Sequence, residues 1–212
     1  MKKEILTILA LACATYSFAQ DSLHVSDAFT LTKASIELRA DYIYNGIDGK
    51  TNDDATGFKG TFFNICLAGD ISEHWSFDIR HRVAKPAKDG KFFDGTDKLK
   101  LIYKPTKDWA IAVGKHSIAV GGYDYGTAPI DLYYTGQYCI DLPCFQWGAN
   151  VAYTLPKGND KFELEVTQSP FRLMYSKKNT YGYSFRYTGN HGIINAIHSL
   201  HFFVNSPSPQ IF

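Results

Sequence analysis

The stretch that decides the fold covers residues 74–82, reads HWSFDIRHR, and alternates between apolar and polar side chains. One set is aromatic or aliphatic, and the set between it is largely charged. The two sets are Trp75, Phe77 and Ile79, and between them Ser76, Asp78, Arg80 and Arg82. Because successive side chains of a β-strand point to opposite faces, this segment predicts a strand with one apolar face and one charged face.

The same period of two recurs in eight further segments. They are residues 34–44, 58–69, 97–104, 109–115, 145–155, 161–168, 181–188 and 193–204. Each has about eight to twelve residues, close to the ~9–11 residues with which a β-strand crosses a membrane. The sequence therefore predicts an all-β protein of about nine strands.

The connections between the predicted strands alternate between short and long. Short polar turns occupy residues 70–73, 105–108, 156–160 and 189–192, and long connections occupy residues 45–57, 85–96, 116–144 and 169–180. Outer-membrane barrels have tight turns at one end and long loops at the other, whereas a soluble sandwich does not sort loop lengths by end. We therefore predict a transmembrane antiparallel β-barrel, with outer-membrane lipid on its apolar face and water on its charged face.

Aromatic side chains stand near the ends of several predicted strands, always on the apolar face. They are Trp75, Tyr103, Trp109, Trp147 and Tyr153. Aromatic residues form girdles at both membrane–water interfaces of such barrels. The pattern favours an aromatic girdle, and an ordinary β core is the alternative.

The first residues have the features of a secretory signal. Lys2 and Lys3 precede a short apolar run at residues 5–13, and a small-x-small cleavage site follows at residues 17–19. We predict a signal peptide over residues 1–19, with a lipoprotein signal ending at Cys13 as the alternative. The remainder divides into an N-terminal periplasmic segment (20–33), barrel strands (34–204) and an irregular C-terminal tail (205–212).

The predicted number of strands is odd, whereas single-chain bacterial barrels have an even number. Two explanations are open: the irregular last segment is miscounted, or the chain is a partial barrel produced by truncation or a frameshift. We favour the partial barrel, because an open sheet in lipid would leave two edges unpaired.

Several other classes of function find no support in the sequence. The formal net charge is +1, which gives no reason to expect a nucleic-acid partner. No Cys/His spacing matches a zinc site, and no Gly-x-Ser-x-Gly motif is present, so we expect no metal, no cofactor and no enzymatic activity. Outside the signal, Cys139 and Cys144 could form a disulfide with Cys66 unpaired, or all three could be free thiols.

Six charged residues are candidates for the lumen and its selectivity. They are Asp78, Arg80, Arg82, Lys98, Lys100 and Lys115. The first five belong to two strands joined by one long connection, so they should share a wall, and Lys115 should stand near the root of the longest connection. The cations could attract anions, or they could form a solvated face paired with neighbours such as Asp78.

Long stretches of the chain resemble the phosphate-selective porin O and P family. They are IELRADYIYN (36–45), WSFDIRHRVAK (75–85), DKLKLIYKPTKDWAIAVGKHSIAVGGYDY (97–125) and APIDLYYTGQYCIDLPCFQWGANVAY (128–153). The resemblance covers roughly residues 34–187. It implies a trimeric outer-membrane barrel of roughly sixteen strands, of which this chain would supply about nine, and passive diffusion of small hydrophilic solutes or ions.

The resemblance also implies that the third long connection, residues 116–144, folds inward as a constriction loop. Its candidate residues are Tyr123, Asp124, Tyr125 and Asp131. Phosphate specificity in the family depends on arginine clusters and a lysine ladder, and this loop carries no lysine or arginine. We therefore expect an anion preference at most; the alternative function is a non-transport outer-membrane or secreted β-sheet protein with a structural or binding role.

Overall fold

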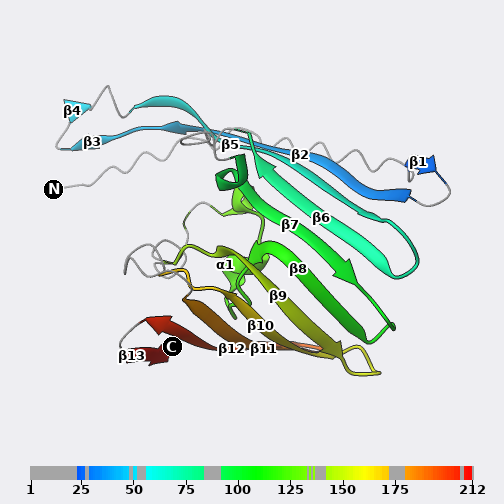
Figure 1. Cartoon of the computed structure of the whole chain (residues 1–212). Helices are drawn as coiled ribbons and strands as arrows, with labels where there is room; N and C mark the ends of the chain where they lie inside the picture. The colour runs from blue at the N-terminus through cyan, green and yellow to red at the C-terminus, as the bar shows by residue number, and fades with distance from the viewer. Residues whose placement is uncertain are drawn as a thin grey trace.

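The computed structural model describes residues 23–26, 29–47, 50–51, 56–83, 92–132, 134, 136, 142–171, 180–205 and 208–211. The predicted signal peptide lies outside these residues. Within them, the chain forms almost only β-structure (Figure 1).

Eleven strands form one antiparallel sheet whose neighbours follow the order of the sequence. They are β1 (Leu23–Ser26), β2 (Phe29–Ile43), β5 (Gly57–Asp70), β6 (Trp75–Arg82), β7 (Thr96–Tyr103), β8 (Trp109–Ser117), β9 (Phe145–Thr154), β10 (Asp160–Gln168), β11 (Tyr181–His191), β12 (Ile194–Asn205) and β13 (Ser208–Ile211). The short strands β3 (Gly46–Ile47) and β4 (Lys50–Thr51) form a separate two-stranded ribbon. The short helical turns are η3 (Phe92–Asp94), α1 (Tyr123–Gly126) and η4 (Pro129–Asp131).

The structure confirms all nine predicted strands and corrects two boundaries. Strand β2 begins at Phe29, five residues before the predicted start, so it includes part of the segment assigned to the periplasm. The tail predicted to be irregular contains β13, which pairs with β12 from Phe202↔Ile211 to Asn205↔Ser208. Pro209 is tolerated there because β13 is an edge strand, whose outward side needs no ladder hydrogen bond.

The alternation of connection lengths is also confirmed. Short turns at residues 71–74, 104–108, 155–159 and 192–193 share one end of the sheet, and the long connections share the other. A hairpin with a short turn fixes the register of its strands. The four short turns therefore set the register of the pairs β5–β6, β7–β8, β9–β10 and β11–β12.

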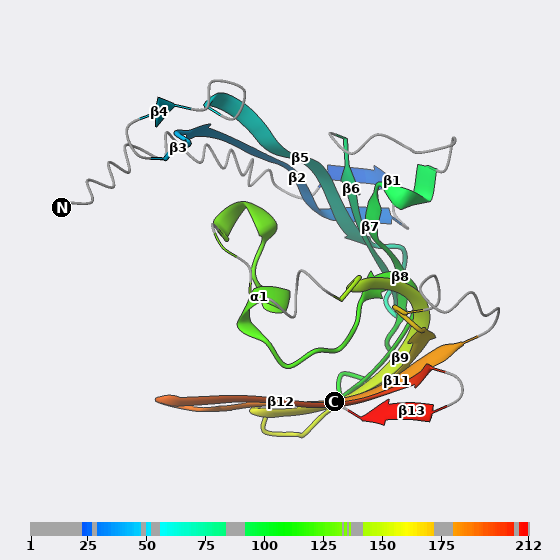
Figure 2. The same cartoon turned by 90° about the vertical axis from the view of Figure 1, so that its left-hand side faces the viewer.

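The sheet curves strongly, and the connection between β8 and β9 lies inside the curve (Figure 2). The strands at its two edges, β1 and β13, are not paired with each other. The described residues thus form an open, curved antiparallel sheet rather than a closed barrel. No helix among them has the length and hydropathy needed to cross a membrane.

The convex face of the sheet is apolar and uncovered by any described segment. Its exposed side chains include Ile36, Leu38, Ile65, Leu101, Ile111, Val113, Val151, Leu164, Val166, Phe185, Leu200 and Phe202. Val113, for example, has 46 % of its surface exposed. A strand position packed against a second layer of protein would be buried instead. Soluble monomers rarely expose a contiguous apolar face of this kind to water.

Gly114 in β8 adopts a backbone conformation that other residues rarely adopt. Its φ is +128°, and a Cβ built there would stand 2.0 Å from the carbonyl oxygen of Leu99 on β7. The obstacle is backbone in a paired strand, so it cannot rotate away as a flexible side chain would.

We expect Gly114→Ala to lower the free energy of unfolding by about 1–3 kcal/mol, because the strained backbone must be held against a clash. Gly60→Ala is the matched control, since no atom lies within 4 Å of its Cβ position. Urea unfolding in detergent, followed by tryptophan fluorescence, measures both variants. Equal effects at the two positions would contradict this account.

Candidate functional site

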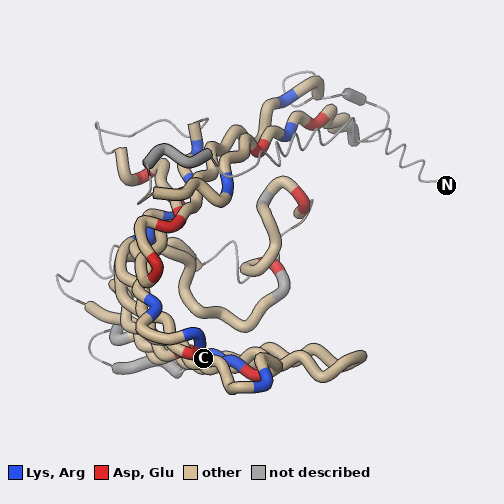
Figure 3. The backbone as a smooth tube through the Cα atoms, turned by 90° about the vertical axis from the view of Figure 1, so that its right-hand side faces the viewer, with Lys and Arg blue, Asp and Glu red and all other residues tan. Residues whose placement is uncertain are grey.

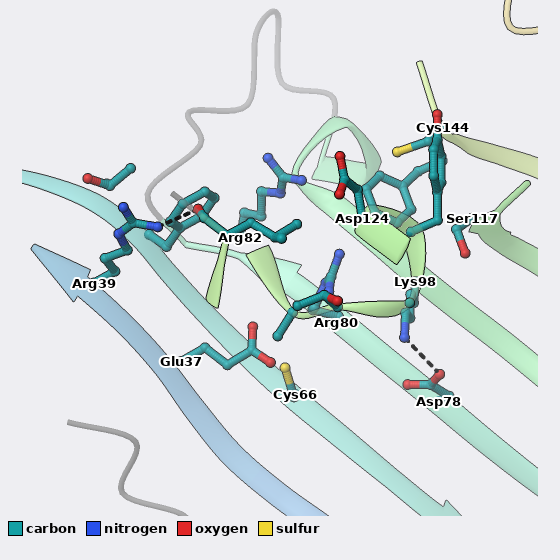
Figure 4. A pocket seen from close by; sticks show the side chains of 18 of the residues that line it. Glu37, Arg39, Cys66, Asp78, Arg80, Arg82, Lys98, Ser117, Asp124 and Cys144 are labelled. Atoms are coloured by element: carbon teal, nitrogen blue, oxygen red, sulfur yellow. Dashed lines mark hydrogen bonds and ion pairs between the residues drawn. The ribbon is translucent and has the colours of Figure 1, made fainter. Parts of the chain in front are cut away.

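A cavity of about 700 Å³ lies between the concave face of the sheet and the connection 118–144, which we call the inner loop (Figure 4). Charged side chains of both signs line it. The cations are Lys33, Arg39, Arg80, Arg82 and Lys98, and the carboxylates are Glu37, Asp41, Asp78 and Asp124. Strands β2, β6 and β7 supply all of these except Asp124, which the inner loop supplies.

The neighbouring strands β6 and β7 bring the predicted basic row together on one wall. The register pairs Asp78 with Lys100 and Arg80 with Lys98. Asp78 accepts ion pairs from both lysines, with N–O distances of 3.6 Å to Lys98 and 3.3 Å to Lys100. The structure therefore places these residues side by side on two neighbouring strands and pairs both lysines with Asp78.

Asp97 is part of this wall, although strict alternation would place it on the apolar face with Leu99. A β-bulge between Arg80↔Lys98 and His81↔Thr96 leaves Asp97 as an extra residue and turns it inward. Its Oδ2 lies 3.0 Å from Arg80 Nη2 and 2.6 Å from Arg82 Nε. The sequence did not predict this residue, because a β-bulge depends on how two strands pair and is not visible in the alternation of side chains along one strand.

Phe145, at the start of β9, packs beneath the same two arginines. The guanidinium carbons of Arg80 and Arg82 lie 5.2 Å and 5.8 Å from the centre of its ring. Alternation predicted Phe145 for the apolar face with Trp147, yet its ring borders the cavity. Cation–π contact therefore adds to the ion pairs that fix both guanidinium groups in place.

The wall as a whole is paired but not neutral. Four cations (Arg80, Arg82, Lys98 and Lys100) share two carboxylates, Asp78 and Asp97, which leaves an excess of two positive charges. Arg80 and Asp97 are buried, whereas Arg82 and both lysines retain 23–32 % of their side-chain surface. The excess charge is therefore on side chains that reach the cavity or its border.

The opposite border of the cavity is built by β2 and β5. Arg39 Nε lies 2.9 Å from Asp41 Oδ1, and the hydroxyl of Thr61 donates to Asp41 Oδ2 at 2.6 Å. A second β-bulge, between Arg39↔Phe62 and Ala40↔Gly60, makes Thr61 the extra residue and turns it toward Asp41. Arg39, Asp41 and Thr61 were all absent from the predicted site.

The inner loop folds into the concave side of the sheet, as the prediction required (Figure 2). Near its start, Glu165 on β10 accepts from His116 Nε2 and from the amide of Ala119, both at 2.8 Å. The amide of Gly121 donates to Ser199 Oγ on β12 at 2.8 Å. Further along, Arg39 on β2 donates to the carbonyl of Leu132. The inner loop therefore spans the concave face from β12 to β2.

An apolar cluster holds both ends of the inner loop against β12. Ile118, Val120 and Leu142 pack with Phe203, whose side chain is fully buried, and Phe171 joins them. Gly182 on β11 makes room for the ring, because a Cβ there would stand 2.7 Å from it. One side of the interior is thus filled with side chains, while the charged side remains open.

A family model for the phosphate-selective porins O and P matches residues 33–204. The chain belongs to this porin family. The match includes β5 to β11 whole, nearly all of β12, and β2 from Lys33 onward, as well as the inner loop. No curated protein matches the chain. Membership in this family indicates a channel protein of the outer membrane.

In this porin the predicted constriction residues have different positions. Asp124 and Tyr125 line the cavity, and Asp124 Oδ2 accepts from the amide of Gly136 at 2.6 Å. Asp131 is exposed, and the side chain of Tyr123 is not among those described. The inner loop carries acidic residues and no lysine or arginine, while both signs alternate along the sheet (Figure 3).

The prediction that Lys115 lines the lumen of the porin was wrong. Lys115 pairs in register with Leu99 and Trp147, both on the convex face, and its Nζ donates to the carbonyl of Phe93 at 2.7 Å. Lys115 comes two residues after Val113 in β8, so the alternation of side chains along the strand already assigns it to the apolar face. It therefore does not belong to the wall of Asp78 and Asp97.

The predicted girdle residues pair across strands. Trp75 and Tyr103 have ring centroids 4.8 Å apart, and Trp109 and Tyr153 are 4.7 Å apart, both at the short-turn end. Trp147 is at the other end, where it contacts the ring of Phe93. Aromatic side chains therefore mark both ends of the convex face, and contact with lipid interfaces stays a prediction.

The cysteines of the porin leave the disulfide untested. Cys139 lies outside the described residues, so its bond to Cys144 stays a prediction. Cys66 is buried and is a free thiol.

The two carboxylates of the wall should differ in their contribution to stability. Asp97→Asn would leave the guanidinium of Arg80, only 9 % exposed, without its buried partner, and we expect a loss of about 3–5 kcal/mol. Asp78→Asn is the matched control; its lysines reach water, so we expect a loss of at most about 1 kcal/mol. Urea titration of the protein refolded in detergent measures both, and similar losses would refute the assignment.

Proposed function

We propose that this porin provides a water-filled pathway for passive diffusion of small hydrophilic solutes and ions across the outer membrane, with a weak anion preference. The cavity between the inner loop and the charged wall is the passage. The uncovered apolar face of the sheet supports contact with lipid on the outside. In lipid, the edge strands β1 and β13 must also find partners, because unpaired backbone groups are costly there. A homotrimer, which the family resemblance implies, is part of the proposal.

This proposal rests on one observation: each carboxylate of the wall is shared by two cations. Asp78 serves two lysines and Asp97 serves two arginines, so the wall keeps a positive excess that is small and partly screened. Charged side chains along a pore tune selectivity without defining a single substrate. The acidic Asp124 on the inner loop faces this wall across the cavity and further reduces the preference for anions.

A preference for anions in general accounts for these residues better than phosphate specificity does. Phosphate is recognised best by clustered guanidinium groups whose paired N–H donors are free to bind it in a bidentate way. Here Arg80 is buried against Asp97, and Arg82 shares the same carboxylate. We therefore expect chloride and phosphate to compete weakly for the pathway.

The pore itself can be tested with the full chain refolded in detergent. We expect a heat-dependent mobility shift on gels and stepwise current increases in planar bilayers. Silent bilayers from protein that shows the mobility shift would instead favour a structural or binding role for the folded sheet.

The charge of the wall should determine the sign of the reversal potential across a salt gradient. Asp78→Asn removes the carboxylate shared by Lys98 and Lys100, so we expect a stronger anion preference. Lys98→Gln should weaken that preference. Lys107→Gln, at a short turn outside the wall, should leave the potential unchanged. Shifts of the same sign in the Asp78 and Lys98 variants would contradict the proposed role of the wall.

A further inference from the structure

The inner loop is fastened to the sheet at two separated places. Its base, around residues 118–121, is held by Glu165, Ser199 and the apolar cluster with Phe203. Its tip, η4 and Leu132, lies beside β2 at the other side of the cavity, where Arg39 reaches it. The cavity is enclosed between these two fastenings.

The base is held mainly by buried packing, whereas the tip is held by one buried side chain and by hydrogen bonds from Arg39. At the base the carboxylate of Glu165 is fully buried, and Ile118 and Phe203 have no exposed surface. At the tip, the side chain of Ile130 is buried, and Arg39 Nη1 donates to the carbonyl of Leu132 at 2.6 Å and to that of Ile130 at 3.4 Å. Buried packing is broken only with extensive unfolding, whereas hydrogen bonds from one side chain can be exchanged for water.

Groups of the sheet itself hold the guanidinium of Arg39 in place, independently of its contact with the inner loop. Asp41 Oδ1 binds Arg39 Nε at 2.9 Å, and Thr61 donates to the other oxygen of Asp41 at 2.6 Å. Asp41 is only 9 % exposed, so its carboxylate is largely covered, although Thr61 itself is exposed. The β-bulge at Thr61 makes it possible, because without the bulge the hydroxyl would point to the convex face.

We propose that Arg39 is the positioning residue that latches the tip of the inner loop to β2, and that it thereby sets the width of the passage. The inference rests on the pore proposed above, but the latch can be tested without it. When Arg39 releases Leu132, the tip swings away from β2 while the base stays fixed. The passage then fluctuates between a narrow and a wider state.

Protease access to the loop provides a test that does not depend on conduction. Chymotrypsin cleaves after aromatic residues, and the inner loop has five tyrosines. Cleavage follows the population of the open form when opening is fast. Since hydrogen bonds from a charged donor are among the stronger ones, we expect Arg39→Gln to speed cleavage within the loop about ten- to hundredfold. The full chain refolded in detergent is used throughout.

Matched variants separate the latch from general effects of charge or stability. Lys59→Gln removes a cation from the same hairpin, in register with Asp41, and should leave cleavage unchanged. Arg39→Lys keeps the charge but loses the planar fork, so its cleavage rate should be intermediate. Arg39→Gln also removes the ion pair with Asp41, so we expect some loss of stability. Cleavage confined to the inner loop, with the strands of the sheet still protected and the gel shift retained, separates the latch from global unfolding, which would expose the whole sheet.

The results decide the latch and the pore separately. Arg39→Gln cleavage within about twofold of the parent rate, or equal acceleration in Lys59→Gln, would overturn the latch. Faster cleavage together with silent bilayers would support the latch and overturn the pore. In conducting protein, the Arg39→Gln channel should show larger current fluctuations than the parent. If Arg39→Gln does not refold, Thr61→Val replaces it: faster loop cleavage supports the latch, and an unchanged rate overturns it.

Discussion

The continuous antiparallel ladder from β2 to β12 is the constraint on which the rest of this porin depends. Each strand pairs with its sequence neighbour, so backbone groups are satisfied inside the sheet and the period of two keeps one chemistry on each face. The apolar convex face and the charged concave face follow from that one arrangement. Curvature then turns a two-faced sheet into a surface with an outside and an inside.

The inner loop converts this concave surface into a defined passage. One half of the interior is filled by Phe203, Ile118 and their neighbours, and the other half stays open beside β2, β5, β6 and β7. Glu165 and Arg39 hold the loop from opposite sides of that opening. A long polar loop on a free surface would be mobile, and contacts with both sides of the curved sheet restrict it.

The charges on the wall illustrate how a porin can be basic without binding anions tightly. Each carboxylate is shared between two cations, so each guanidinium or ammonium group of this wall has its charge partly compensated. Shared partners also hold the long side chains in place, which keeps the passage open. The same sharing limits how strongly the wall can discriminate among anions.

The sequence by itself determined the nine long strands and the sorting of connection lengths. It also determined which charged residues point inward, namely Asp78, Arg80, Arg82, Lys98 and Lys100. A period of two is a local property, so the order of the side chains along the chain reveals it. Only the tertiary structure decided the inward turn of Asp97 and Thr61, the contact of Phe145 with two arginines, and the reach of Arg39 across to Leu132. Bulges are set by how two strands meet, and a contact between residues 93 positions apart depends on the path of the loop between them. The family resemblance anticipated that the loop enters the barrel, but only the folded chain shows which side chains hold it there.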